Sequence, residues 1–205
     1  MIRRPCDTGG MHVAWAAECS AEDPVLVVPW KDPDGAAAFI DLRENPYDLD
    51  HVTEAAEHPP LMQALRALNA TRSPVFTAKC DAWAMDADEL EELRLELDLI
   101  AAETPAGFAS YIDLVWRDRT VFASFHQHEQ MLRRLERLAA PLDLPAVAID
   151  CVVRPAMVDL SGAREGYALS LYVKAAGADR QSAWQQWSVG LAAVVGMLRG
   201  RDFKR

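Results

Sequence analysis

The sequence has few cysteines and no long apolar run. Its four cysteines, Cys6, Cys19, Cys80 and Cys151, include no C-x-x-C pair, and a disulfide framework is not expected in a chain of 205 residues. No stretch approaches the roughly 18 consecutive apolar residues of a membrane helix, and the apolar core of a signal peptide is missing after Met1. These absences predict a cytoplasmic protein that makes no membrane contact.

An excess of basic residues is also missing, as are the signatures of common enzymes. The formal net charge is −10 and the isoelectric point is about 4.9, which disfavours nucleic acid and anionic membranes as partners. The chain has no G-x-S-x-G motif, phosphate-binding loop or dinucleotide fingerprint. Asp7-Thr8-Gly9 spells the aspartic-protease triplet, but Arg3-Arg4-Pro5 precedes it instead of an apolar strand, so chance explains it. We expect no cofactor.

One histidine-rich segment invites a metal-site interpretation that helix geometry opposes. His126 and His128 stand two residues apart, which places them about 200° apart around a helix axis, so they cannot share one ion. His128 falls on the apolar side with Leu132 and Leu135, as expected of a half-buried structural histidine. His126 and Glu129 have the i,i+3 spacing at which side chains meet. We therefore expect no metal site.

What the sequence does contain is a regular alternation of strand and helix patterns. Apolar residues make up 51% of the chain and charged residues 25%, as in ordinary globular domains. Period-two patterns predict strands at 25–30, 37–42, 75–85, 108–117, 146–158 and 167–175. Helical spacing predicts helices at 61–69, 87–97, 119–140 and 179–198. The turn Asp32-Pro33-Asp34-Gly35 predicts that the first two strands form a hairpin. Residues 1–23 show little periodicity and are expected to be a loosely packed N-terminal extension.

The order of these elements repeats along the chain. Two strands and a helix occur within 74–140 and again within 146–199, and 24–70 is a possible third, degenerate copy. We predict an α+β fold in which residues 24–205 form a single domain. Its core is an antiparallel sheet of four to six strands, built from two and possibly three such units, with helices mainly on one face.

Alternation along the strands assigns side chains to the two faces of this sheet. The predicted core face carries Phe76, Ala78, Cys80, Ala82, Ile112, Leu114, Trp116, Ile149, Cys151, Val153, Leu169, Leu171 and Val173. The other face, here called the polar–aromatic face, carries Ser170 and ten candidate binding residues: Lys79, Asp81, Trp83, Tyr111, Asp113, Arg117, Asp150, Arg154, Tyr172 and Lys174. This face is either a solvated surface with cross-strand ion pairs or a binding surface in which aromatics supply contact area.

The predicted C-terminal helix is apolar on nearly all sides. One side carries Trp184, Trp187, Leu191, Val194, Val195 and Leu198, and the other carries Val189, Ala192, Ala193, Gly196 and Met197. Such a helix is usually buried on two sides, by 1–23, by 43–70 or by another subunit. We take Val189, Ala193 and Met197 as a candidate interface for self-association or a protein partner.

The leading functional hypothesis is a non-enzymatic, acidic binding protein. It would engage a protein partner or ligand through the polar–aromatic face or the C-terminal helix. The alternative is a hydrolase-type enzyme that uses Asp81, Asp113 and Asp150 for acid–base chemistry. Lys79 and Arg154 are among the cations that could instead pair with these carboxylates. A deep pocket lined by two of the aspartates would favour the enzyme, and a flat open face would favour the binding protein.

Overall fold

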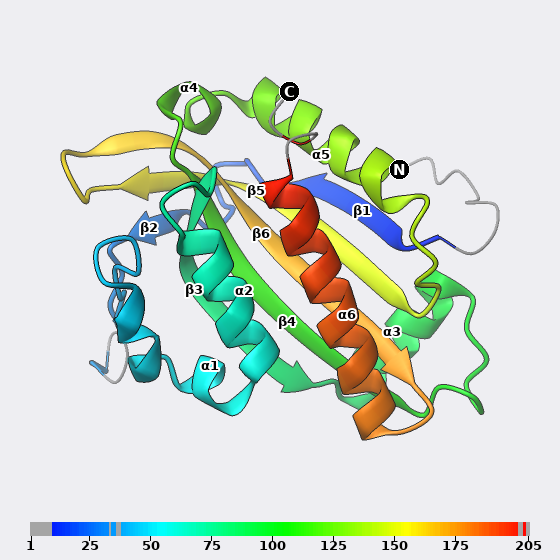
Figure 1. Ribbon diagram of the computed structural model, residues 1–205. Coiled ribbons are helices and arrows are strands. Elements are labelled where there is room, and N and C mark those ends of the chain that lie inside the picture. Colours follow the sequence, from blue (N-terminus) through cyan, green and yellow to red (C-terminus); the bar gives the residue numbers. More distant parts are fainter. Residues whose placement is uncertain (1–9, 33, 36–37, 201–202, 204–205) are drawn as a thin grey trace.

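The computed structural model describes residues 10–32, 34–35, 38–200 and 203, and it shows an α+β fold. The strands are β1 (His12–Ala17), β2 (Leu26–Val28), β3 (Val75–Ala84), β4 (Ala106–Trp116), β5 (Val147–Val158) and β6 (Arg164–Gly177). The helices are η1 (Pro46–His51), α1 (Thr53–Glu57), α2 (Pro59–Asn69), α3 (Ala87–Leu97), α4 (Arg119–Phe122), α5 (Phe125–Ala139) and α6 (Arg180–Arg199). The six strands form one sheet in the order β1–β5–β6–β4–β3, with β2 also paired to β5 (Figure 1).

The sheet is mostly antiparallel, as predicted, but the two strands paired to the outer edge of β5 run parallel to it. The pairs β3–β4, β4–β6 and β5–β6 are antiparallel. β1 and β2 both run parallel to β5 and lie one after the other along its outer edge. Residues 12–17 of the expected N-terminal extension are therefore an edge strand of the sheet.

The predicted hairpin of 25–30 and 37–42 is wrong. β2 pairs with Ala156–Val158 of β5, and a single antiparallel bridge joins Lys31 to Ala38. Within the predicted turn, the Gly35 N–H donates to Asp32 O at 2.9 Å and Gly35 has a positive φ, whereas residue 33 lies outside the described chain. The apolar run Leu26–Val28 gains more burial by extending the six-stranded sheet than a two-stranded ribbon could offer.

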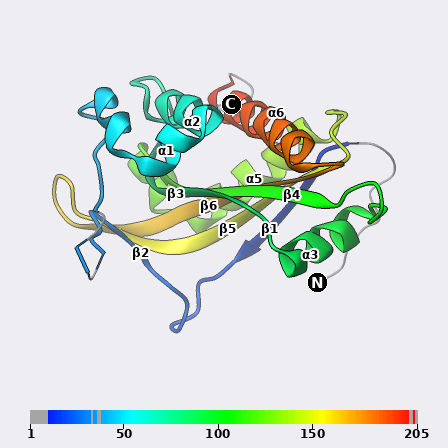
Figure 2. The same cartoon turned by 90° about the horizontal axis from the view of Figure 1, so that it is seen from below.

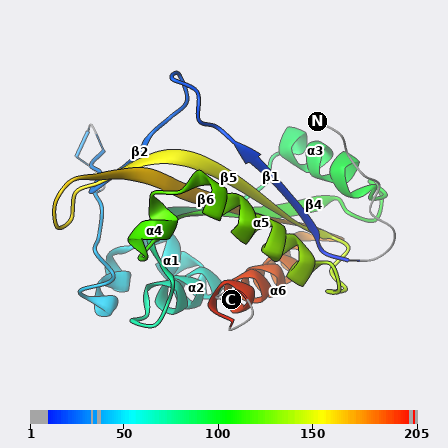
Figure 3. The same ribbon diagram turned by 90° about the horizontal axis from the view of Figure 1, so that it is seen from above.

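The helices divide unequally between the faces. α1, α2, α5 and α6 lie over one face, and α3 lies on the opposite face (Figures 2 and 3). The core under α6 centres on Trp187, which is fully buried and donates its Nε1–H to Ser110 Oγ at 2.8 Å. In the part of the chain that the structure describes, no helix has both the length and the apolar character required to cross a membrane.

Three cysteines are described, and all three are free thiols. Cys151 is fully buried, Cys80 is half-buried and Cys19 is exposed. Burial raises the pKa of the Cys80 thiol to about 12 and also raises that of Cys151. The two strand cysteines therefore behave as small apolar side chains, as predicted.

A shift in register on β3 changes the predicted faces. The pairing with β4 is irregular between Thr77 and Cys80, so the alternation of side chains slips there. Thr77 points to α2, where Asn69 Nδ2 donates to its Oγ1 at 2.7 Å. Phe76, assigned to the core face from sequence, consequently lies on the opposite face, paired with Val115.

Asn69 fastens α2 to β3 at this irregularity, and its removal is expected to be costly. The side chain is 3% exposed, donates also to Leu65 O, and accepts from Thr77 N at 3.0 Å. Asn69→Ala leaves a buried N–H without an acceptor and should lower the free energy of unfolding by about 1–3 kcal/mol. Urea denaturation would measure it, with the exposed Gln63→Ala on the same helix as control. Equal midpoints for the two variants would contradict this role.

Candidate functional site

In the part of the chain that the structure describes, the polar–aromatic face has three zones: a buried apolar end, a middle zone whose aromatic rings keep some exposed surface, and an end covered by α3. At one end lie four buried apolar residues, Phe76, Val115, Ala168 and Val158. Their burial on a face without α2, α5 or α6 requires another cover. The chain between β2 and η1 covers Phe76 of this set with Arg43, and its own Leu42 is only 4% exposed.

Specific contacts anchor this covering segment to β3. Trp30 Nε1 donates to Ala78 O at 2.8 Å, and the Arg43 guanidinium lies 4.5 Å from the Phe76 ring centre. Arg117, a predicted binding residue, also belongs to this end. Its guanidinium donates to the carbonyl oxygens of Val75 and Asn69 and thus supports the backbone.

The other end of the face is covered by α3. Leu90 and Leu93 project from one side of this helix and pack on Ala148 and Ala176, small residues that let the helix approach the sheet closely. The sequence predicted this helix at 87–97 but not its position on the sheet, because Ala148 and Ala176 lie on strands far away in the sequence.

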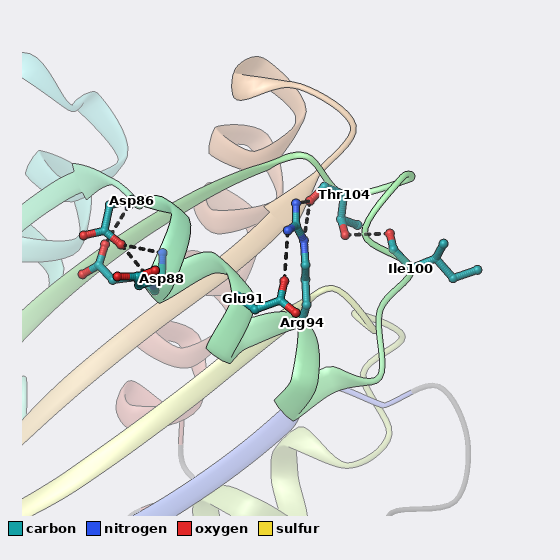
Figure 4. Close-up of polar contacts among 7 residues, drawn as sticks. Asp86, Asp88, Glu91, Arg94, Ile100 and Thr104 are labelled. Carbon is teal, nitrogen blue, oxygen red and sulfur yellow. Dashed lines mark hydrogen bonds and ion pairs between the residues drawn. The ribbon is translucent and has the colours of Figure 1, made fainter.

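Polar contacts make α3 and the loop after it a compact unit (Figure 4). Asp86 and Glu89 form a capping box, in which the Asp86 side chain accepts from the backbone N–H of Glu89 and the Glu89 side chain accepts from that of Asp86. Arg94 pairs with Glu91 and donates to Thr104 O, which holds the loop against the helix. This unit therefore borders the middle zone of the face.

An ion network fastens α3 to the sheet. Glu96 of α3 lies 3.2 Å from His12 Nε2 and 2.9 Å from Lys174 Nζ, and Lys174 also pairs with Asp150. Burial alone would raise the pKa of Glu96, but hydrogen bonds from His12 and Lys174 outweigh it and lower the pKa to about 2. The hydrogen bond to Glu96 raises the pKa of His12. Two predicted binding residues, Lys174 and Asp150, thus form ion pairs within the protein itself.

This network should give stability a specific dependence on pH. The depressed pKa of Glu96 means that its contribution is present above about pH 4.3, the unfolded value, and is lost as pH falls toward 2. The raised pKa of His12 means that its contribution is present below about pH 6.5 and is lost as pH rises through the folded value. The contribution of the pair is therefore largest near pH 5.5.

Glu96→Gln should lower the free energy of unfolding by about 1–3 kcal/mol at pH 5.5. The difference from the unsubstituted protein should shrink as pH falls below about 4.3, because the carboxyl is then protonated in the unfolded state. Urea denaturation across this pH range would measure it. Glu91→Gln, on the same helix and more exposed, is the matched control and should change stability by less than about 0.5 kcal/mol. A difference that stays constant with pH would contradict the assignment.

A row of four side chains crosses the middle zone. Asp81 of β3 pairs with Tyr111 of β4, Tyr111 with Tyr172 of β6, and Tyr172 with Asp150 of β5. The two tyrosine rings, here called the tyrosine pair, have centres 5.9 Å apart. Trp83 extends the row toward α3, with its ring 6.4 Å from that of Tyr111 and its Nε1–H bonded to Glu89. All three rings are half-buried, so each keeps some exposed surface.

Beside this row lies the buried carboxyl group of Asp113. It is 7% exposed and accepts a hydrogen bond from Ser170 Oγ at 2.6 Å. Burial raises the pKa of Asp113, against the lowering effects of that hydrogen bond and of Arg154 and Lys79. Burial also raises the pKa of Tyr111 to about 12, with help from the negative charges of Asp113 and Asp81.

The remaining cations of the face have partners of their own. Arg154 pairs with Glu18 at 3.0 Å, and Lys79 Nζ lies 5.0 Å from the centre of the Trp30 ring. The sequence identified both cations but not Glu18 or Trp30, because both partners come from the N-terminal region whose course was unknown. His12, Glu89 and Glu96 were missed for a similar reason: pairing of β1 and docking of α3 bring them to this face.

The two best-formed surface depressions in the described part of the chain lie away from the aspartate group. One, of about 480 Å³, lies near the β5–β6 hairpin and is lined by Cys19, Val25, Met157 and Tyr167 among others. The second, of about 360 Å³, lies between Trp30, Val52, Leu65 and Cys80. Neither is lined by Asp81, Asp113 or Asp150.

The histidines of α5 lie as helix geometry predicts. His128 is 1% exposed, contacts the rings of Trp116 and Tyr167, and has Nδ1 3.0 Å from Ser124 O. Burial lowers its pKa. His126 Nδ1 approaches Glu129 at 3.5 Å. Among the described residues, no three His, Cys, Asp or Glu side chains converge as a metal ion would need, and Asp7-Thr8-Gly9 lies outside them.

α6 is covered on its flank by α2, which lies within one of the segments expected to do so (Figure 1). Its outer side keeps Val189 52% exposed, whereas Ala193 and Met197 are half-buried. The interface predicted at these three residues stays a prediction. Light scattering that found only the 22.7-kDa monomer at micromolar concentration would contradict self-association.

The sequence matches no protein-family model, and comparison with curated proteins and with solved structures finds no match either.

Proposed function

We propose that this chain is a non-enzymatic, cytoplasmic binding protein that engages a protein partner through the middle zone of its polar–aromatic face. The observation that carries the proposal is the aromatic row of Trp83, Tyr111 and Tyr172, which crosses three strands and keeps some exposed surface on each ring. The chain covers both ends of the same face with its own segments. Leaving aromatic area uncovered between them is what a binding surface needs.

The shape of this zone favours a macromolecular partner over a small substrate. Small-molecule sites are concave and bury most of the ligand surface. Neither depression is lined by the three aspartates, and Asp150 is engaged by Lys174. The hydrolase alternative needs two carboxylates directed into a pocket, so the geometry supports it less well.

A related proposal concerns the order of elements. Two strand–strand–helix units, β3–β4–α5 and β5–β6–α6, would each supply two of the four central strands. The tyrosine pair then lies where the units join, between β4 and β6. Such a junction gives a partner access to side chains of both units.

The functional proposal can be tested by affinity capture, with two surface variants used as bait in parallel. Tyr172→Ala should reduce capture of the natural partner at least about tenfold, as expected for a central aromatic contact. The matched control is Val189→Ser, which removes an apolar side chain that is 52% exposed on α6. Quantitative mass spectrometry of captured proteins measures the effect, and circular dichroism verifies that both variants are folded.

Only selective loss with Tyr172→Ala supports the proposal. Equal capture by Tyr172→Ala and the unsubstituted protein would overturn it. Loss with Val189→Ser alone would move the interface to α6.

A further inference from the structure

The depression of about 360 Å³ lies at the β3 edge of the sheet, apart from the tyrosine pair. Here β3, α1 and α2 contact one another, and the covering segment between β2 and η1 lines the remaining side (Figure 1). Its volume falls within the range of sites for small ligands. Neither Tyr111 nor Tyr172 lines this pocket, so it is a second site, independent of the proposed binding surface.

Much of the pocket wall is apolar. Three parts of the chain contribute large apolar side chains to it: Phe39, Ile40, Val52 and Leu65. Leu65 is buried, whereas the other three are half-buried and leave part of their apolar surface uncovered. A ligand with an apolar body would remove that surface from water, which is favourable.

Trp30 holds one positive charge at this pocket. Its Nε1–H donates to Ala78 O at 2.8 Å, which fixes the indole ring. The Lys79 ammonium lies 5.0 Å from the centre of that ring, and both side chains line the pocket. Burial raises the pKa of Asp113 and the charge of Lys79 lowers it, but Lys79 forms no ion pair among the described residues. Its ammonium can therefore pair with an anionic group of a ligand.

A negative charge lies at the same pocket, on α1. Glu54 is half-buried and lines the pocket, and in the described chain its carboxylate forms no hydrogen bond or ion pair. Burial, and after it the charge of Glu54, raises the pKa of the Cys80 thiol, which also lines the pocket. Glu54 and Lys79 thus border one apolar pocket with opposite charges and do not pair with each other. A molecule carrying both charges would supply each of them with a partner.

We infer that this pocket binds a free α-amino acid with a large apolar side chain, whose carboxylate pairs with Lys79 and whose ammonium pairs with Glu54. An α-amino acid carries both charges at one end and its side chain at the other, which matches two charges beside an apolar wall. A simple carboxylate would be repelled by Glu54, and a simple amine would be repelled by Lys79. The two opposite charges therefore select the zwitterion.

Isothermal titration calorimetry with four defined compounds tests this inference. L-phenylalanine carries both charges and a ring, 3-phenylpropionate only the carboxylate and ring, 2-phenylethylamine only the ammonium and ring, and L-alanine both charges without a large side chain. We expect L-phenylalanine to bind most tightly. Each of the other compounds should bind at least about tenfold more weakly, because it lacks one charge pair or the apolar contact.

Two charge variants assign the roles of the side chains. Lys79→Gln should weaken binding of L-phenylalanine about tenfold and also weaken that of 3-phenylpropionate, without weakening that of 2-phenylethylamine. Glu54→Gln should weaken binding of L-phenylalanine to a similar degree and affect the two analogues in the opposite way. The matched controls are Arg66→Gln on α2 and Glu57→Gln on α1, exposed residues outside the pocket lining, and both should leave binding unchanged.

A third variant tests the pocket itself. Val52→Phe enlarges a half-buried wall residue and keeps both charges. It should weaken binding of L-phenylalanine at least about tenfold, because the larger side chain occupies volume that the ligand needs. Circular dichroism verifies that each variant is folded.

Any of three results would overturn the inference. They are no binding of L-phenylalanine by the unsubstituted protein, equal affinity for L-phenylalanine and its two singly charged analogues, and charge variants that bind L-phenylalanine as their controls do. Unchanged affinity of Val52→Phe would place the binding elsewhere and reject this pocket.

Discussion

The alternation of side chains along β4, β6 and β5 is the constraint on which the rest of the structure depends. Because successive residues point to opposite faces, Ile112 and Leu171 enter the core under the helices while Tyr111 and Tyr172 are held on the other side. The fully buried core residues fix the register. A slip of one residue would bury the tyrosines and expose the core, so packing on one face also positions the candidate site.

The middle zone is defined by what covers its two ends. At one end apolar residues on the sheet are buried by the chain after β2, and at the other α3 packs its leucines on Ala148 and Ala176. Between them Asp81 is exposed, and the rings of Trp83, Tyr111 and Tyr172 keep some exposed surface. Covering the Asp81 carboxylate with an apolar loop would cost free energy, because the charge would lose its hydration without gaining a partner.

The sequence was sufficient for the elements with strong local periodicity. The central strands, the long helices and the face of Tyr111, Asp113 and Tyr172 all follow from alternation and helical spacing. Three features were not predictable in this way. The pairing of β2 is decided by the free edge of β5, the reversal at Phe76 by an irregular register, and the docking of α3 by small residues on distant strands. Each depends on a partner far away in the sequence, which local patterns do not encode.

The fastening of α3 and the charge of the candidate site are consequences of the same arrangement. Glu96 and Asp150 neutralise Lys174 beneath the helix, so this lysine cannot also compensate Asp81 or Asp113. Trp83 connects the two regions, because its indole bonds Glu89 of α3 while its ring contacts Tyr111. The position of α3 therefore influences the orientation of the aromatic row. A partner that bound the tyrosine pair would meet a surface already organised by that helix, so little free energy would be lost in ordering it.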